Sequence, residues 1–234
     1  MILLRLISLA AIMLAIGFPA LADDAIVDKV YHPYVLPNER ELEWRLVSRQ
    51  LDSGNVLMQR LGYGYAVRED LSIEVYLIGE RDDKENFDLE GYEVEARWML
   101  TEQGKYWADW GMLFEVEKEH EESNWEASAA LLFEKEFGRT SLTANVFAEY
   151  EWGSSIENEF ETELRVNYRY RWKPAIQPAI EIYVGKGFVG IGPAITGLYR
   201  YEKQKQLKWE LGFITGLNGN DKDHTLRLAL EWEY

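Results

Sequence analysis

RTSLTANVFAEYEW (residues 139–152) and FETELRVNYRYRW (residues 160–172) decide the fold, because both stretches alternate between apolar and polar side chains. In the first, one face carries Leu142, Ala144, Val146, Ala148, Tyr150 and Trp152, and the polar face has a single apolar exception, Phe147. Side chains of a β-strand point alternately to two faces, so both stretches are predicted strands. The charged face of the second stretch holds too many Glu and Arg residues for a packed protein interior.

The same alternation recurs almost without interruption from Glu39 to Tyr234, and no window shows a sustained helical period. Predicted turns fall at residues 51–55, 68–71, 82–87, 101–105, 120–124, 137–140, 153–158, 172–175, 185–188, 203–206 and 218–223. They predict about twelve strands, with ten or fourteen left open if a hairpin is merged or split. Each strand with its connection then takes about 16 residues, which suits tilted membrane strands better than the shorter strands of soluble proteins.

The first 22 residues, MILLRLISLAAIMLAIGFPALA, have the pattern of a cleaved secretory signal peptide. Arg5 precedes a short apolar stretch, and small residues stand at Ala20 and Ala22 before Asp23. Residues 23–38 contain two Pro and no sustained alternation, so they are expected to form an extended periplasmic lead-in, which could instead plug the barrel mouth. Residues 39–234 form the predicted barrel.

Composition narrows the function. The chain of 234 residues has 25 Lys plus Arg against 41 Asp plus Glu, a formal charge of −16, and no Cys. Nucleic-acid binders carry a basic face, so nucleic acid is excluded as a partner. The absence of Cys excludes a disulfide scaffold, a thiol nucleophile and a Cys-ligated metal.

The tryptophans sort to strand ends when both termini are assigned to the periplasm. Trp125 and Trp152 then lie near outer strand ends, and Trp107 alone among the rest has the wrong facing, which a β-bulge would explain. Indole rings prefer the boundary between lipid and water. The expected membrane-interface aromatic residues are Trp44, Trp98, Trp110, Trp172, Trp209, Trp232 and Tyr234.

The last eight residues, RLALEWEY (227–234), resemble the C-terminal assembly signal of Gram-negative outer-membrane β-barrel proteins. Arg227, Ala229, Trp232 and Tyr234 occupy its polar, small and two late aromatic positions, although Ala229 stands where Gly is usual. With the signal peptide and the repeated hairpins, the resemblance covers nearly the whole chain. It implies an all-β, antiparallel, up-and-down transmembrane β-barrel in the outer membrane, in contact with lipid and recognised by the barrel assembly machinery through its last strand. We expect a monomer.

The competing fold is a periplasmic β-sandwich or a lipocalin-like soluble barrel. Such proteins also alternate, but they bury the apolar face and expose the charged one. The facing of the two sets of side chains therefore distinguishes the alternatives.

If the apolar face meets lipid, the charged face lines the lumen. The candidate lumen-lining residues are Glu43, Arg45, Glu93, Glu95, Arg97, Glu115, Glu149, Glu161, Glu163, Arg165, Arg169, Arg200, Glu210 and Arg227. Surplus carboxylate favours cations or neutral polar solutes over anions, and it disfavours acidic sugars. We therefore expect a narrow passive pore; the alternatives are a lipid-modifying hydrolase and a non-conducting structural or adhesion barrel, the latter if ion pairs block the lumen.

No catalytic residues are predicted, because neither G-x-S-x-G nor H-E-x-x-H occurs. His120 and His224 lie in acidic segments near the expected outer rim, where a hydrolase site would have to be built. No motif predicts a cofactor or a metal, and NGNDKD (218–223) departs from the EF-hand pattern at its first position and at the closing Glu.

Overall fold

The structure is a computed structural model that describes residues 27–50, 54–81, 87–202, 205–217 and 224–234. The predicted signal peptide at residues 1–22 and the NGNDKD segment lie outside these ranges. Among the described residues, no helix has the length and apolar character needed to cross a membrane.

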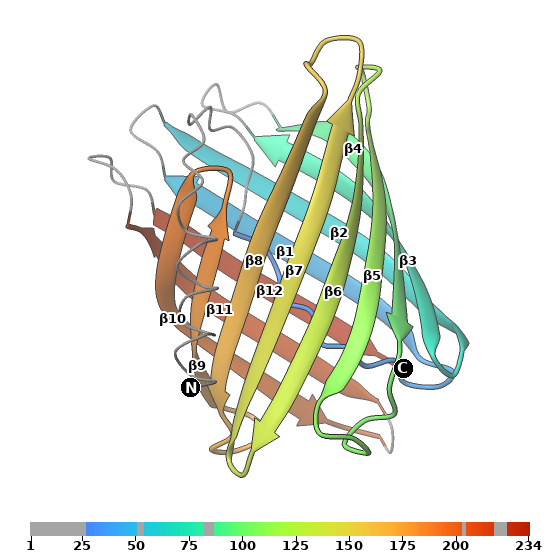
Figure 1. Cartoon of the computed structure of the whole chain (residues 1–234), viewed down its shortest axis with the longest axis vertical. Helices are drawn as coiled ribbons and strands as arrows, with labels where there is room; N and C mark the ends of the chain where they lie inside the picture. Colours follow the sequence, from blue (N-terminus) through green and yellow to red (C-terminus); the bar gives the residue numbers. More distant parts are fainter. Residues whose placement is uncertain (1–26, 51–53, 82–86, 203–204, 218–223) are drawn as a thin grey trace, which may run out of the picture.

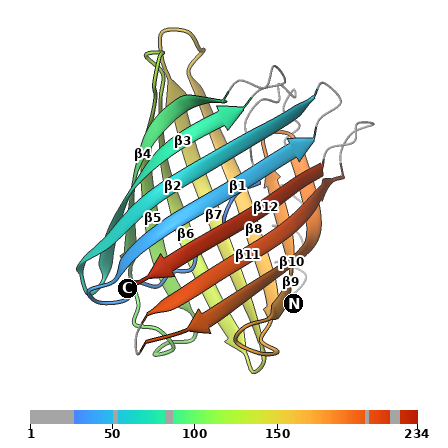
Figure 2. The same ribbon diagram turned by 180° about the vertical axis from the view of Figure 1, so that it is seen from behind.

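The described residues form twelve antiparallel strands that close into one barrel (Figure 1). The strands are β1 (Arg40–Gln50), β2 (Asn55–Arg68), β3 (Leu71–Arg81), β4 (Phe87–Met99), β5 (Asp109–Glu119), β6 (Trp125–Phe137), β7 (Thr140–Trp152), β8 (Glu159–Tyr170), β9 (Gln177–Gly185), β10 (Phe188–Arg200), β11 (Gln206–Gly216) and β12 (His224–Glu233). Each strand pairs with its sequence neighbours, and β12 pairs with β1 to close the sheet (Figure 2). The predicted architecture and strand number are confirmed.

The two faces of the strands distinguish this barrel from a soluble one. Val75, Val146 and Ile180 point outward and are about half exposed, at 49%, 52% and 52%. Glu95 and Arg227 point inward and have no exposed surface. An apolar exterior around a charged interior is the arrangement of a membrane barrel, so the lipocalin-like and sandwich alternatives are wrong.

Both ends of the barrel sheet lie at the same rim. The backbone N–H of Tyr234 donates to the carbonyl oxygen of Arg40 at 2.9 Å, which joins the last residue to the start of β1. We call this rim the terminal end, and the opposite rim, which carries the β5–β6, β7–β8 and β9–β10 connections, the distal end. Assignment of the terminal end to the periplasm stays a prediction.

The β9–β10 connection shows how short the turns are. Lys186 and Gly187 have φ angles of 42° and 71°, the left-handed pair that a type I′ hairpin turn requires. Gly187 adopts this conformation without steric cost, which is why GKGF marks a turn in the sequence.

Residues 27–35 run inside the barrel, and we call them the lumen segment. From Leu36, where the chain turns into β1 at the terminal end, the lumen segment passes back toward the middle of the lumen. Val27, Val30 and Tyr31 are all buried. Residues 27–35 therefore lie inside the barrel, in a stretch for which the sequence predicted an extended periplasmic lead-in.

Candidate functional site

The candidate lumen-lining residues alternate along the strands with the apolar residues of the outer face. All the candidate lumen-lining residues are buried or half-buried except Arg200, which is exposed at the terminal end of β10 and donates to the side chain of Gln206 at 3.2 Å. Arg227 illustrates the interior, because its guanidinium lies 2.7 Å from Glu181 and 2.6 Å from Glu210. Glu181, Glu210 and Arg227 come from β9, β11 and β12, so these ion pairs connect different strands of the barrel.

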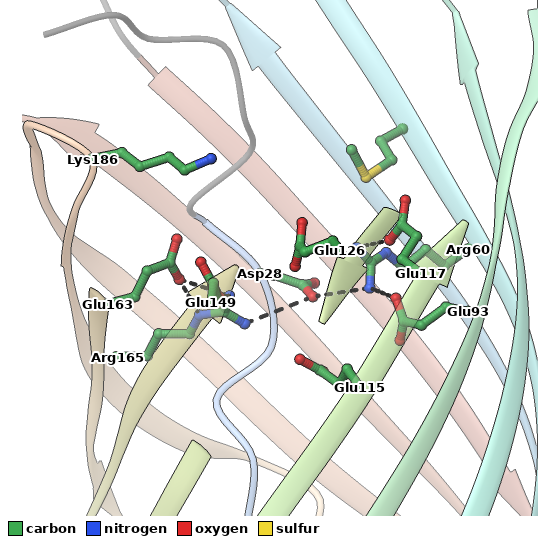
Figure 3. A pocket seen from close by; sticks show the side chains of 11 residues that line it. Asp28, Arg60, Glu93, Glu115, Glu117, Glu126, Glu149, Glu163, Arg165 and Lys186 are labelled. Atoms are coloured by element: carbon green, nitrogen blue, oxygen red, sulfur yellow. Dashed lines mark hydrogen bonds and ion pairs between the residues drawn. The ribbon is translucent and has the colours of Figure 1, made fainter. Parts of the chain in front are cut away.

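The lumen segment is anchored first by Asp28. Its Oδ2 lies 2.5 Å from Nη1 of Arg45. It also lies 3.7 Å from Nη1 of Arg60 and 3.9 Å from Nη1 of Arg165 (Figure 3). Burial alone would raise the pKa of Asp28, but the three guanidinium groups outweigh it and hold the pKa well below its usual range. The carboxylate is thus a negative centre among three positive side chains from β1, β2 and β8.

Lys29 forms the second ionic anchor. Its Nζ lies 2.5 Å from Glu43 on β1 and 3.0 Å from Glu231 on β12. Burial lowers the pKa of Lys29, but Glu231 and Glu43 outweigh burial and raise it well above its usual range. The two neighbouring charges of the lumen segment, of opposite sign, therefore each find opposite charge on the wall.

The backbone of the lumen segment is also paired. The N–H of Tyr31 donates to Oδ1 of Asn145 at 2.7 Å, and Nδ2 of Asn145 donates back to the Tyr31 carbonyl at 2.9 Å. The hydroxyl of Tyr183 donates to the carbonyl of Asp28 at 2.6 Å. A buried chain with no neighbouring strand needs such partners for its N–H and C=O groups, and lumen-facing side chains supply them.

Apolar contacts complete the docking of the lumen segment. Two buried clusters hold it: Val27 and Val30 with Tyr183 and Ile214, and Tyr31 with Leu113, Ala130, Leu132 and Phe147. Sequence reasoning missed these lumen residues as a site. One feature of the sequence could have indicated them: large apolar side chains, such as Phe147, on the otherwise polar face. A large apolar side chain at such a position is expected to pack against other protein atoms and not against water.

Nearer the terminal end, polar contacts continue along the same path. Nδ1 of His32 lies 2.5 Å from Glu134, and the hydroxyl of Tyr34 donates to Asp109 at 3.0 Å. Gly111 passes close to Pro33, since a Cβ at this glycine would lie 3.0 Å from the proline ring. A side chain here would push the lumen segment away from β5.

Two larger cavities lie on either side of this segment and share no lining residue. The distal cavity has a volume of about 110 Å³, and the cavity at the terminal end has about 460 Å³. The distal cavity is lined by Asp28, Met58, Arg60, Glu93, Glu115, Glu117, Glu126, Glu149, Glu163, Arg165 and Lys186 (Figure 3). Its walls therefore carry seven acidic and three basic residues.

The interface aromatic residues lie on the outside near the two rims. Trp98, Trp172, Trp232 and Tyr234 are 40%, 55%, 43% and 43% exposed, and Trp44, Trp110 and Trp209 are half-buried on the outer face. At the distal end, Trp125 and Trp152 stack with ring centroids 6.4 Å apart. Trp107 lies in the β4–β5 connection, so the irregular chain there accounts for its facing without a bulge. Of the assembly-signal residues, Arg227 and Ala229 face the lumen and Trp232 and Tyr234 face outward.

The rim histidines contact aromatic rings. The Tyr92 hydroxyl lies 3.1 Å from Nδ1 of His120, and the His224 ring packs 5.6 Å from Phe213. Within the described part of the chain, Nδ1 of His224 has no hydrogen-bond partner. A serine hydrolase needs a serine hydroxyl bonded to the histidine, and neither of these two contacts involves a serine.

No protein-family model and no curated protein matches the chain. Among solved structures, it is similar to an outer membrane channel from Pseudomonas putida F1, with 13% identity, a TM-score of 0.61, and coverage of 89% of this chain and 100% of that one. It is also similar to the KdgM porin in complex with disordered oligogalacturonate (12% identity, TM-score 0.56, 83% and 99% coverage) and to the β domain of the Bordetella autotransporter BrkA (10%, 0.50, 84% and 100%). These similarities show the fold. The chain therefore has the fold of Gram-negative outer-membrane β-barrel proteins, and its apolar exterior between two aromatic girdles assigns it to the outer membrane.

Proposed function

We propose that the protein is an outer-membrane channel for small cations or small neutral polar solutes, closed by its own lumen segment. The acidic lining of the distal cavity carries this proposal, because seven carboxylates against three basic groups attract cations and repel anions. The KdgM porin was solved with oligogalacturonate, an acidic sugar chain. The lining of the present cavity disfavours a solute of that charge.

The lumen segment supports a closed state. It lies between the two cavities and contacts β1, β7, β9 and β12 through the pairs described above. Its residues are buried except His32 and Tyr34, which are half-buried. A solute that crosses the lumen must displace it. The channel proposal thus requires that residues 27–35 move, whereas a barrel in which they never move is the non-conducting structural protein that forms the second candidate.

Conductance across a planar bilayer separates the two candidates. The full mature chain is expected to conduct rarely or in brief openings, and a variant lacking residues 23–35 is expected to conduct steadily with cation preference. A milder double variant, Asp28→Asn with Lys29→Gln, keeps the chain length and is expected to open more often than the parent.

The β-sheet signal in circular dichroism and the heat-dependent electrophoretic mobility confirm that the barrel is folded in each sample. A folded deletion variant without current would establish the non-conducting barrel. Current that prefers anions would overturn the cation part of the proposal while leaving the channel.

A further inference from the structure

Three lumen carboxylates converge at one point of the wall. Glu93 and Glu95 on β4 and Glu115 on β5 each place one carboxylate oxygen within 4.8 Å of the others. The register sets Glu95 directly opposite Glu115 on one side and Glu74 on the other. Like charges directly opposite one another in a sheet are destabilising, so this arrangement needs a compensating positive charge.

The neighbouring side chains compensate only part of this charge. Oε2 of Glu93 accepts from Arg60 at 2.6 Å, and Oε2 of Glu115 accepts from Ser128 at 2.5 Å. Glu95 is fully enclosed, yet neither of its oxygens accepts a hydrogen bond from any described residue. Nη2 of Arg97 lies 3.7 Å from Oε1 of Glu95, but it donates its hydrogen bond to Glu74 instead. A buried carboxylate without partners is costly.

The lumen segment carries an unpaired polar group in the same region. The guanidinium of Arg97, which lies 3.7 Å from Glu95, is also 6.0 Å from the centroid of the Tyr31 ring. The hydroxyl of Tyr31 is buried and has no hydrogen-bond partner among the described residues. A tyrosine hydroxyl is neutral at neutral pH, so it offers a neutral oxygen ligand. Two groups without hydrogen-bond partners, one on the wall and one on the lumen segment, thus belong to residues that both lie close to Arg97.

We propose that Glu93, Glu95 and Glu115 bind a divalent cation of the size of calcium, with the Tyr31 hydroxyl as a neutral ligand. Calcium takes six to eight oxygens at about 2.3–2.6 Å, so opposite ligands stand about 4.6–5.2 Å apart. One oxygen of each carboxylate lies within 4.8 Å of the others, so a single ion can contact all three. Magnesium usually keeps several of its waters, whereas calcium accepts a site built from several protein oxygens.

The distal cavity supplies the route to the site. Glu93 and Glu115 belong both to the carboxylate group and to the lining of the acidic cavity. A cation that enters from the distal end therefore reaches the site without passing the lumen segment. Once bound, it ties the barrel wall to Tyr31 and strengthens the docking of that segment.

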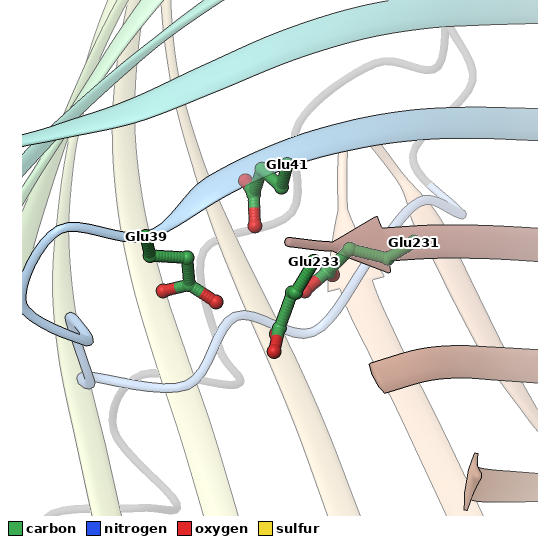
Figure 4. Close-up of side chains that lie close together, drawn as sticks. All are labelled: Glu39, Glu41, Glu231 and Glu233. Carbon is green, nitrogen blue, oxygen red and sulfur yellow. The ribbon is translucent and has the colours of Figure 1, made fainter. Parts of the chain in front are cut away.

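A second acidic group in the barrel provides the matched comparison. Glu39, Glu41, Glu231 and Glu233 lie close together near the junction of β1 and β12 (Figure 4). There, Nζ of Lys208 lies 2.6 Å from Glu231 and contacts Glu233, and Nζ of Lys29 lies 3.0 Å from Glu231. Ammonium groups already provide the positive charge, so we do not expect a metal at this group.

The test is titration of the full mature chain with calcium chloride by calorimetry, in detergent free of lipopolysaccharide. The parent is expected to bind one calcium ion at this site, and Glu95→Gln is expected to weaken binding at least ~10-fold. Tyr31→Phe removes one neutral ligand and weakens binding by less. Glu233→Gln, in the second acidic group, leaves the affinity unchanged. Calcium also raises the unfolding temperature of the parent but not of Glu95→Gln, because a ligand stabilises only the state that binds it.

Either of two results would overturn the site. One is the absence of saturable calcium binding by the folded parent. The other is binding that Glu95→Gln leaves as strong as in the parent, which would place the ion elsewhere. If calcium fails to bind and infrared spectra show carboxyl groups that remain protonated at neutral pH, the three carboxylates hold protons and no metal. None of these measurements depends on whether the barrel conducts.

Discussion

Asp28 is the residue on which the docking of the lumen segment depends most. Three guanidinium groups surround a carboxylate that side-chain burial has removed from water. Breaking a buried ion pair from one side leaves the other charges uncompensated, which costs more than the pair contributes. The sequence showed an acidic residue in an irregular lead-in, and nothing local revealed its three partners, which are brought together only when the barrel closes.

Asp28→Asn is expected to lower the free energy of unfolding by about 3–5 kcal/mol, since two buried arginines, Arg45 and Arg165, and the half-buried Arg60 then lose their common partner. Urea unfolding of the barrel in detergent, followed by tryptophan fluorescence, measures the change. Asp70→Asn is the matched control, because the Asp70–Arg68 pair at 3.0 Å is exposed and such pairs contribute about 0–1 kcal/mol. Equal effects of the two substitutions would show that Asp28 is no anchor.

The pKa directions of Asp28 and Lys29 predict that docking is insensitive to moderate pH. The pKa of Asp28 is lower in the folded barrel than its ordinary value of about 3.9. Its ion pairs therefore stabilise the docked segment fully above that ordinary pKa, and the stabilisation is lost only when the pH falls through the lowered pKa. The pKa of Lys29 is higher in the folded barrel than its ordinary value of about 10.4. Its ion pairs therefore stabilise the docked segment fully below that ordinary pKa, and the stabilisation is lost only when the pH rises through the raised pKa.

Because the chain has no Cys, a Val30→Cys variant reports directly on the segment. Its labelling by a methanethiosulfonate reagent, corrected for the reactivity of free cysteine, is expected to stay slow from about pH 5 to 9. Adding Asp28→Asn should accelerate labelling. Rapid labelling of the single variant at pH 5 would contradict the assigned directions.

At the scale of elements, period-two alternation and turn residues were enough to predict the strands. All the turn-like segments fall at strand connections, including GKGF with its type I′ conformation. The lumen segment was harder, because a short stretch without alternation carries no local preference and takes its path from the barrel around it. Phe147 was the available clue: an apolar ring on the polar face, now seen packed against Tyr31 at a centroid distance of 6.3 Å.

The last strand closes the barrel, because β12 pairs with both β11 and β1. We propose that its outward aromatic residues, Trp232 and Tyr234, are read by the barrel assembly machinery. Replacing both with Ala is expected to reduce the folded protein in outer membranes severalfold, measured as the heat-modifiable fraction. Tyr170→Ala is the control, since Tyr170 is also an exposed aromatic residue at the terminal end of its strand. An equal loss of folded protein in the Tyr170→Ala control would show that Trp232 and Tyr234 contribute no more to assembly than other aromatic residues at the membrane interface.

At the scale of the whole molecule, the formal charge of −16 is divided between two environments. Part lies in connections and part lines the lumen, where low exposure reduces screening by water and salt. The sequence predicted the sign of the lumen from alternation alone. It could not predict how much of that charge is neutralised, because pairing depends on which strands the closed barrel brings together.

Ion selectivity measures the charge that remains after pairing. For the variant lacking residues 23–35, we expect cation preference in a salt gradient at about 0.1 M that weakens toward 1 M, because the Debye length falls from about 10 Å to about 3 Å. Neutralising Glu117, Glu126 and Glu149 to Gln in that background should abolish most of the preference, since all three line the distal cavity. Glu102→Gln, in an exposed pair with Lys105, should change nothing. Cation preference that survives the triple substitution would show that the charges responsible for it lie outside the distal cavity, at the terminal end.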